Sequence, residues 1–194
     1  MLEAVSGQAH NLEVGGSIPS SATNKRSVAV TGHTSGIGKS IFEYFTTDIV
    51  KGYSRSNGYD ITLQTDRLRI LNDVKNFDIF VNNAYSNFDN SQLLMLKEIC
   101  ELWQNEDKIV INISTRFTET DHLYSTTKQA LDEYCKLFQR TPLYVLNLKP
   151  GAVDTPRIKN IDVDKMSSNN ILTVIDFCLL NRNKFKVHSL CFGK

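Results

Sequence analysis

The sequence predicts an α/β domain built around a doubly wound parallel sheet. Segments with strand-like and helix-like patterns alternate from residue 27 to the end of the chain, which is typical of a parallel sheet with helices on both faces. Several strand candidates are continuous apolar runs, such as Ile109-Val110-Ile111, as expected of strands buried on both sides. A glycine-rich turn joins the first strand candidate to the first helix candidate. Together these features favour a three-layer Rossmann-type fold in a single domain, which suits a length of 194 residues.

The expected elements follow in chain order. Strands are expected at residues 27–31, 49–53, 77–81, 108–113, 142–148 and 186–192, with a short strand near 59–61. Helices are expected at residues 37–47, 64–75, 91–104, 123–139 and 168–180, where apolar residues recur at helical spacing. Crossovers between parallel strands are expected to be right-handed.

Composition narrows the class of protein. Lysine and arginine number 22 and aspartate and glutamate 21, so the formal net charge is +1 and no basic field points to nucleic acid. The cysteines (Cys100, Cys135, Cys178 and Cys191) form no Cys-x-x-Cys pair, which favours reduced thiols in a cytoplasmic protein over disulfides or zinc. The longest apolar run, residues 171–180, is too short to span a bilayer. We therefore expect a cytoplasmic protein without a metal, a membrane or a nucleic-acid partner.

Residues 1–27 carry no sustained periodicity and no signal-peptide pattern. The run Gly-Ser-Ile-Pro-Ser-Ser-Ala-Thr from Gly16 to Thr23 resembles translation through the 3′ arm of a tRNA gene. We therefore hypothesise that the start codon is misassigned and that the protein begins near Val28. A disordered N-terminal arm is the alternative, and the nucleotide sequence before codon 28 distinguishes the two.

The glycine turn occupies the run Thr-Gly-His-Thr-Ser-Gly-Ile-Gly from Thr31 to Gly38. Unpaired N–H groups and the dipole at a helix start favour an anion, and glycines let the backbone approach it. The spacing of Gly32, Gly36 and Gly38 differs from the usual Gly-x-Gly-x-x-Gly fingerprint. By itself the run therefore predicts either a phosphate-binding turn or a turn that merely reverses the chain.

A second candidate site is the pair Tyr124 and Lys128. Residues four apart on a helix project from the same face. An ammonium beside a phenol favours the phenolate and brings its pKa from about 10 toward neutral pH, as proton-transfer catalysis requires. The alternative is a surface tyrosine and a surface lysine at a common spacing.

Five short motifs occur in a fixed order along the chain. They are Thr31-Gly32-x-x-x-Gly36-x-Gly38, Asn82-Asn83-Ala84, Ile113-Ser114-Thr115, Tyr124-x-x-x-Lys128 and Pro150-Gly151-x-Val153-x-Thr155. In this order they resemble the motifs of the short-chain dehydrogenase/reductase family in its compact single-domain form. The resemblance runs from about Val28 to the C-terminus. It implies an oxidoreductase that transfers hydride between a nicotinamide cofactor and a small-molecule carbonyl or secondary alcohol.

The resemblance implies the catalytic roles. Tyr124 would be the acid/base, and Lys128 would bind the nicotinamide ribose and lower the pKa of Tyr124. Ser114 or its neighbour Thr115 would donate to the substrate oxygen, where negative charge develops. Asn90 would support a water-linked proton relay, with Asn87 as the competing choice. Asn90 is equally suited to the N-cap of the following helix.

The cofactor contacts are implied in the same way. Gly32, Ser35, Gly36, Ile37 and Gly38 would surround the pyrophosphate, and Asp60 and Ile61 would contact adenine. The remaining contacts to the cofactor would come from Asn82, Asn83, Ala84, Pro150, Gly151, Val153 and Thr155, together with Tyr124 and Lys128.

The end of the second strand bears on the choice of cofactor. NAD-binding proteins place an acidic side chain there to bind the ribose 2′-hydroxyl, whereas this chain has Lys-Gly-Tyr-Ser-Arg-Ser at 51–56. Arg55 could pair with a 2′-phosphate and Ser54 could add a hydrogen bond. The sequence therefore favours NADP(H), with NAD(H) as the alternative cofactor. The alternative interpretation of Arg55 is a solvated surface charge.

The chain also departs from the family pattern. Tyr85 stands where glycine usually follows Asn-Asn-Ala, and the segments before residue 91, between Ser114 and Tyr124, and after Thr155 are short. A nucleotide-binding regulatory or scaffold protein therefore remains the alternative function, ahead of an extended sugar-nucleotide epimerase. The resemblance also implies a homodimer or homotetramer built through the helices at 91–104 and 123–139.

Overall fold

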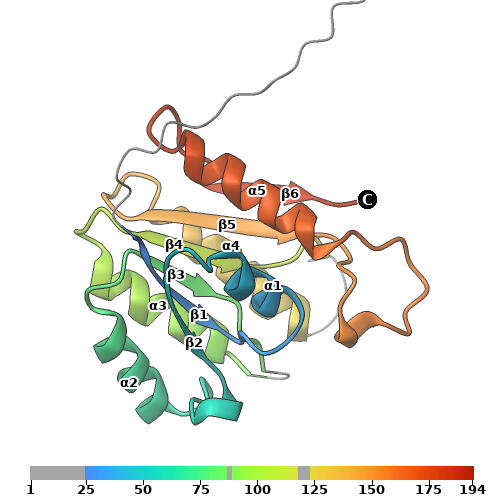
Figure 1. Ribbon diagram of the computed structural model, residues 1–194, viewed down its shortest axis with the longest axis horizontal. Coiled ribbons are helices and arrows are strands. Elements are labelled where there is room, and N and C mark those ends of the chain that lie inside the picture. The colour runs from blue at the N-terminus through green and yellow to red at the C-terminus, as the bar shows by residue number, and fades with distance from the viewer. Residues whose placement is uncertain (1–24, 87–88, 118–122) are drawn as a thin grey trace, which may run out of the picture.

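The computed structural model describes residues 25–86, 89–117 and 123–194. The strands are β1 (Ser27–Thr31), β2 (Ile49–Tyr53), β3 (Ile79–Asn82), β4 (Ile109–Ile113), β5 (Tyr144–Pro150) and β6 (Ser189–Phe192). The helices are α1 (Gly36–Tyr44), α2 (Gln64–Val74), α3 (Ser91–Trp103), α4 (Leu123–Lys136) and α5 (Ser168–Asn181), with two 3₁₀ turns, η1 (Arg55–Asn57) and η2 (Pro156–Ile158). The strands form one parallel sheet in the order β2-β1-β3-β4-β5-β6 (Figure 1). The predicted doubly wound α/β fold is confirmed.

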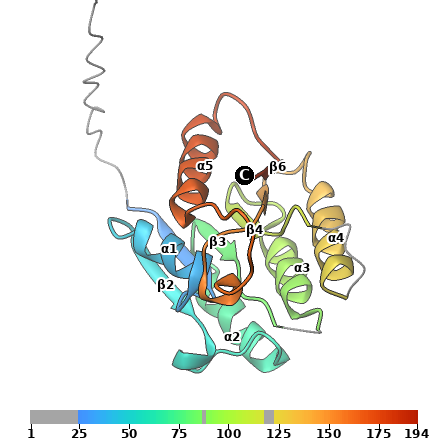
Figure 2. The ribbon, with the colours of Figure 1, turned by 90° about the vertical axis from the view of Figure 1, so that its right-hand side faces the viewer.

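Alternate residues of each strand pack on opposite faces of the sheet. Val28 and Val30 of β1 belong to the core under α1 and α5, whereas Ala29 between them belongs to the core under α2, α3 and α4. Figure 2 shows α1 and α5 on one side of the sheet and α3 and α4 on the other. Ile70 of α2 is fully buried, and such a side chain contributes about 2 kcal/mol relative to an exposed one. Burial on both faces explains why the inner strands β1, β3, β4 and β5 are largely apolar, whereas the edge strands β2 and β6 are partly exposed.

The winding of the sheet changes direction at β1, which pairs with β2 on one side and with β3 on the other. A crevice forms at the carboxyl ends of parallel strands where this happens, and ligands bind there. Gly32, Asn83, Ser114 and Gly151 follow directly on β1, β3, β4 and β5. The motifs found in the sequence therefore meet at one edge of the sheet.

The short strand expected near residues 59–61 is wrong. The N–H of Asp60 donates to the carboxylate of Asp66 (2.9 Å), and the N–H of Thr62 donates to Asp60 Oδ1 (3.0 Å). Side chains thus bind N–H groups that a strand would offer to a neighbouring strand. The segment is a turn, and the preceding η1 was not expected.

Several element ends also differ from the expected bounds: α4 ends at Lys136 rather than at residue 139, and β6 begins at Ser189 rather than at residue 186. α1 ends at Tyr44, three residues before the expected end at residue 47. Of the expected N-terminal arm at 1–27, residues 1–24 lie outside the described residues. Ser27 begins β1, and its N–H donates to Asp78 Oδ2 (2.7 Å). The end of that arm is therefore part of the sheet.

Within the described part of the chain, no helix has both the length and the apolar character needed to cross a membrane.

Candidate active site

Two adjoining cavities lie at the carboxyl edge of the sheet. The glycine-turn pocket, of about 450 Å³, is lined by residues of the β1–α1 turn and of the segment after β2. The Tyr124 pocket, of about 460 Å³, is lined by residues that follow β4 and β5 and by α4. Ile37, Asn83, Tyr85, Thr155 and Arg157 line both. One ligand can therefore extend from the first pocket into the second.

Most of the predicted site residues line these cavities. The glycine-turn pocket receives Gly32, Ser35, Gly36, Ile37, Ser54, Arg55, Asp60, Ile61, Asn83, Ala84 and Thr155. The Tyr124 pocket receives Ser114, Thr115, Tyr124, Lys128, Pro150, Gly151 and Val153. Gly38, Asn82 and Asn90 line neither pocket.

The glycines of the turn are required by close packing. Gly32 has φ +71° and Gly36 has φ +55°, a region that favours glycine. A Cβ on Gly38 would lie 2.3 Å from Asn83 Nδ2 and 2.3 Å from the carbonyl oxygen of Gly32. The start of α1 is thus held against the β1 end, with its unpaired N–H groups beside the glycine-turn pocket.

The Asn82-Asn83-Ala84 run braces this turn. Asn83 Nδ2 donates to the carbonyl oxygens of Thr31 (3.1 Å) and Gly32 (3.4 Å). The N–H groups of Asn83 and Ala84 both donate to Thr31 Oγ1, each at 3.0 Å. Asn82 instead points into the sheet, where its amide donates to Asn112 Oδ1 (2.9 Å). Asn82 therefore supports the site without lining it.

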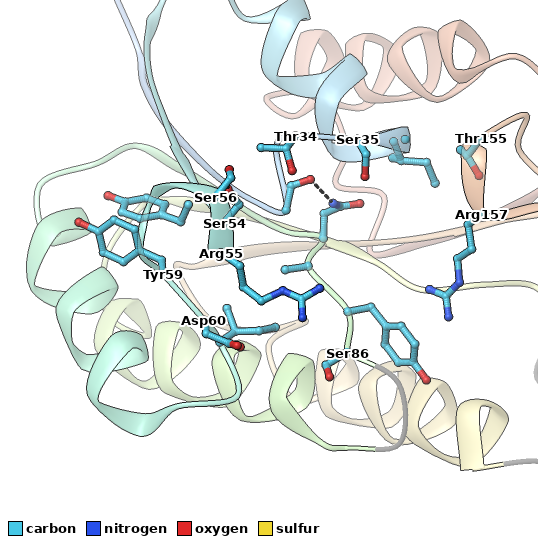
Figure 3. Close-up of a pocket in the computed structure, with 18 of the residues that line it drawn as sticks. Thr34, Ser35, Ser54, Arg55, Ser56, Tyr59, Asp60, Ser86, Thr155 and Arg157 are labelled. Carbon is cyan, nitrogen blue, oxygen red and sulfur yellow. Dashed lines mark hydrogen bonds between the residues drawn. The ribbon is translucent and has the colours of Figure 1, made fainter.

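Arg55 and Ser54 lie on the far side of the glycine-turn pocket. Figure 3 shows the guanidinium groups of Arg55 and Arg157 reaching into the pocket from opposite sides. The N–H of Ser54 donates to Asn57 Oδ1 (2.8 Å), which holds the η1 turn against the end of β2. No acidic residue precedes Asp60 in this segment, so positive charge faces the pocket where β2 ends.

The Tyr124 phenol forms a hydrogen bond with the Thr115 side chain. Burial raises the pKa of the Tyr124 phenol, while a hydrogen bond from the Thr115 side chain and the charge of Arg157 lower it and Tyr85 raises it. Ser114 Oγ is buried in the same pocket and has no hydrogen-bond partner among the described residues. Of the two hydroxyl candidates, Thr115 is thus the one that contacts the phenol.

Lys128 is buried beneath these residues. Its Nζ donates to Gln92 Oε1 (2.7 Å) and to the carbonyl oxygen of Ile113 (3.1 Å). Burial lowers the pKa of Lys128 to about 7; Arg157 also lowers it, and Asp132 raises it. This differs from the expectation that Lys128 lowers the pKa of Tyr124, because the ammonium is directed to neutral acceptors and the charge acting on the phenol comes from Arg157.

Tyr85 occupies the space between the two cations and the phenol. Its ring meets that of Tyr124 edge-on, with centroids 5.2 Å apart and an interplanar angle of 90°. Lys128 Nζ lies 5.0 Å from the Tyr85 centroid, and Arg157 Cζ lies 4.7 Å from it. The Tyr85 ring therefore lies against Lys128 and Arg157 as well as Tyr124, while Lys128 still lines the Tyr124 pocket.

No protein-family model matches the sequence, and no curated protein matches it either. Solved structures do match the fold. A short-chain dehydrogenase from Burkholderia cenocepacia in complex with NADP has a TM-score of 0.71 at 18% identity, over 87% of this chain and 88% of that one. A β-ketoacyl-[ACP] reductase from Bacteroides thetaiotaomicron has a TM-score of 0.69 at 21% identity, over 88% and 97%.

A 3α-hydroxysteroid dehydrogenase from Pseudomonas sp., complexed with NADH, has a TM-score of 0.71 at 15% identity, over 86% of this chain and 94% of that one. The chain has the short-chain dehydrogenase/reductase fold.

Asn90 is expected both as the N-cap of α3 and as a polar residue of the site, but these two features fall on different residues, Asn90 and Gln92. Asn90 is exposed at the N-cap of α3, and its side chain makes no capping hydrogen bond. Gln92, on the buried face of the first turn, instead bonds Lys128 and donates through Nε2 to the carbonyl oxygens of Asn82 (3.1 Å) and Ile113 (2.9 Å). A polar residue on the buried face of α3 was the signal that sequence reasoning passed over.

Arg157 is the second residue that sequence reasoning missed. It lies two residues after Thr155, in η2, and lines both pockets. The sequence signal was a basic residue two positions after the Pro150–Thr155 motif. The other competing position for the relay, Asn87, lies outside the described residues.

Proposed function

We propose that the protein is an NADP(H)-dependent oxidoreductase that transfers hydride between nicotinamide and a carbonyl or secondary alcohol. The observation that carries this proposal is the hydrogen-bonded pair of Thr115 and Tyr124, in a pocket that adjoins the glycine-turn pocket. Two hydroxyls near one point suit a substrate oxygen, and the adjoining pocket suits a dinucleotide.

The residues present fit this cofactor. Gly32 and Gly36 line the glycine-turn pocket at the start of α1, which supports binding of a pyrophosphate there. Arg55 supports binding of a 2′-phosphate, because a guanidinium makes charge-assisted, bidentate contacts with phosphate. Asn83, Ala84 and Thr155 line the glycine-turn pocket and would make further contacts with the cofactor. When bound, NADP(H) supplies the hydride or accepts it in the reverse direction.

The chain's own residues account for the proton chemistry. Because burial raises its pKa, Tyr124 is protonated at neutral pH and can give a proton to a carbonyl oxygen. The hydrogen bond from Thr115 and the charge of Arg157 then stabilise the phenolate that is left. Thr115 and Ser114 can donate to the substrate oxygen as negative charge develops on it.

An NADPH-oxidation assay over small ketones, aldehydes and quinones tests the proposal, with Tyr124→Phe as the paired variant. We expect turnover of at least one compound by the natural protein, strong loss in Tyr124→Phe, and unchanged NADPH binding in that variant. Absence of NADPH binding to the natural protein would contradict the proposal outright.

The alternative is a nucleotide-binding regulatory or scaffold protein that does not catalyse the reaction. The specific observation in its favour is that the Tyr85 ring lies 5.0 Å from Nζ of Lys128, the residue expected to bind the nicotinamide ribose. Tight NADPH binding without turnover of any compound, together with activity gained in Tyr85→Gly, would favour this alternative.

The proposed assembly is a homodimer or homotetramer through α3 and α4. Leu137, just after α4, is 68% exposed, and such a side chain is suited to an interface. Light scattering of the purified protein measures the oligomeric state, and a monomer at micromolar concentration would contradict this assignment.

A further inference from the structure

Gln92 is a polar side chain in the core between α3 and the sheet. It lies in the first turn of α3, is 1% exposed and lines neither pocket. A buried amide has to form hydrogen bonds to offset its loss of water. An apolar side chain would fill the same space without that requirement, as Met95 and Leu96 do in the next turn. The partners of Gln92 therefore indicate what the amide contributes.

These partners fix which way the amide points. Nε2 of Gln92 donates to the main-chain carbonyl oxygens of Asn82 (3.1 Å) and Ile113 (2.9 Å). A carbonyl oxygen can only accept, so the NH₂ group is held on that side and Oε1 on the other. Asn82 Nδ2 in turn donates to the main-chain oxygen of Gln92 (3.1 Å). The ends of β3 and β4 thus hold Oε1 in one orientation.

Lys128 is the group that Oε1 meets. Its Nζ donates to Gln92 Oε1 (2.7 Å) and to the carbonyl oxygen of Ile113 (3.1 Å), its hydrogen-bond partners among the described residues. An ammonium has three N–H donors on a flexible four-carbon stem. Two acceptors in fixed places restrict this stem and leave one donor for the Tyr124 pocket, which Lys128 lines. The contact with Oε1 therefore decides where Nζ can meet a ligand.

Two aromatic rings lie on the other side of the ammonium. Lys128 Nζ is 5.0 Å from the centre of the Tyr85 ring and 5.6 Å from that of the Tyr124 ring. The face of an aromatic ring attracts a cation. Without the Oε1 acceptor, the long side chain of Lys128 would be free to move toward these rings. Gln92 thus opposes a displacement of Nζ within the site.

We propose that Gln92 is a positioning residue of this site: through Oε1 it holds Lys128 where the ammonium can bind the nicotinamide ribose of NADPH. This inference rests on the proposed function and on the expected contact of Lys128 with that ribose. Because Gln92 lines neither pocket, it acts on the cofactor only through Lys128. Its removal should weaken contacts to the nicotinamide half of the cofactor and leave contacts to the adenosine half intact.

The test compares binding of NADPH with binding of 2′,5′-ADP, which has the adenosine and 2′-phosphate of NADPH but lacks the nicotinamide and its ribose. Isothermal titration calorimetry measures both affinities. We expect Gln92→Met, which removes the amide at similar volume, to weaken NADPH binding by about tenfold, the contribution of a hydrogen bond to a charged group, and to leave 2′,5′-ADP binding unchanged. Gln104→Met, at an exposed position after α3, is the matched control and should change neither affinity.

A double substitution tests whether Gln92 acts through Lys128. Lys128→Met should lower the preference for NADPH over 2′,5′-ADP at least as much as Gln92→Met does. The variant with both substitutions should equal Lys128→Met, because a positioning residue has no effect once the residue that it positions is gone. Losses that multiply in the double variant, an unchanged preference in Gln92→Met, or equal losses of both ligands in Gln92→Met would each overturn the inference.

Two further results separate this inference from protein folding and from the proposed function. Gln92→Glu keeps an oxygen for Nζ, so it should keep the preference for NADPH; loss of that preference in folded Gln92→Glu overturns the inference even if Gln92→Met does not fold. An unchanged preference in Gln92→Met, beside turnover of a carbonyl compound, would overturn the inference and leave the oxidoreductase proposal standing. Absence of NADPH binding to the natural protein would overturn both.

Discussion

The Nζ of Lys128 lies 2.7 Å from Oε1 of Gln92, and both side chains are buried. The pair joins α4 to α3 across 36 residues of sequence. A buried ammonium without a carboxylate acceptor is costly, and each hydrogen bond to a neutral oxygen offsets part of that cost. Gln92 also bonds the carbonyl oxygens at the ends of β3 and β4. It therefore fixes Lys128 relative to the sheet edge at which both pockets lie.

Replacing Gln92 with leucine should destabilise the protein. The variant Gln92→Leu removes one of the hydrogen-bond acceptors of the buried ammonium, at a cost of about 1–3 kcal/mol. Urea unfolding measures the change in the free energy of unfolding. Gln104→Leu, at an exposed position after α3, is the matched control and should change the stability little. Equal effects of the two substitutions would show that the bond to Lys128 contributes nothing.

The stability of the protein should depend on pH through Lys128. Its pKa in the folded state is about 7, below the ordinary value of 10.5. Between these values the unfolded chain binds the proton and the folded chain releases it, so the free energy of unfolding rises with pH. From pH 7 to 9 we expect a rise of roughly 1 kcal/mol per pH unit at most.

Urea unfolding of Lys128→Met over the same pH range tests this origin. The variant should lose the rise, whereas Lys159→Met, at an exposed lysine, should keep it. A rise that persists in Lys128→Met would assign the dependence to another group.

Thr115 and Ser114 should respond differently to removal of their hydroxyls. Thr115→Val removes the group that bonds Tyr124, so we expect kcat/KM to fall by about tenfold or more. Ser114→Ala removes a buried hydroxyl that has no hydrogen-bond partner in the described part of the chain, so the stability should be unchanged or slightly higher. Steady-state kinetics and urea unfolding of both variants measure these effects. The reverse order of kinetic losses would make Ser114 the principal donor to the substrate.

Arg55 should discriminate between the two nicotinamide cofactors. Arg55→Ala should weaken NADPH binding by about ten- to a hundredfold, the contribution of a charge-assisted contact, and leave NADH binding nearly unchanged. Fluorescence titration with each cofactor measures both affinities. Lys51→Ala is the control, because Lys51 lies on β2, pairs with Asp73 of α2 (2.7 Å) and lines neither pocket. Equal losses of NADPH and NADH would refute the 2′-phosphate assignment.

The glycine turn should not accept a side chain at Gly38. Gly38→Ala places a Cβ 2.3 Å from backbone and side-chain atoms of Gly32 and Asn83, so we expect loss of NADPH binding and a lower melting temperature. Gly58→Ala is the comparison, because that Cβ meets open space and the only strain comes from φ +83°, which costs about 1 kcal/mol. The prediction fails if the two variants unfold at the same temperature and bind NADPH equally.

The sequence alone predicted the main helices and strands and the order of the motifs. Residues 27–31 form a strand with the expected bounds, because a continuous apolar run reports a strand buried on both faces. Residues 49–53 also form a strand with the expected bounds, at the edge of the sheet, where only Gly52 and Tyr53 are buried. Glycine at 32 and 36 predicted the tight turn before α1, since positive φ is a local property of the backbone. The strand expected at 59–61 failed because the carboxylates of Asp60 and Asp66 bind the backbone there.

The composition of the site was decided by the tertiary structure. Gln92 and Arg157 belong to no motif, and only the packing of α3 and η2 against the carboxyl edge brings them to Lys128 and Tyr124. The direction of the pKa shift at Tyr124 was likewise beyond the sequence, because burial outweighs the charges around the phenol. Hydrophobic period and glycine placement are local in the chain, whereas desolvation and the choice of hydrogen-bond partner depend on residues that meet only after the sheet has formed.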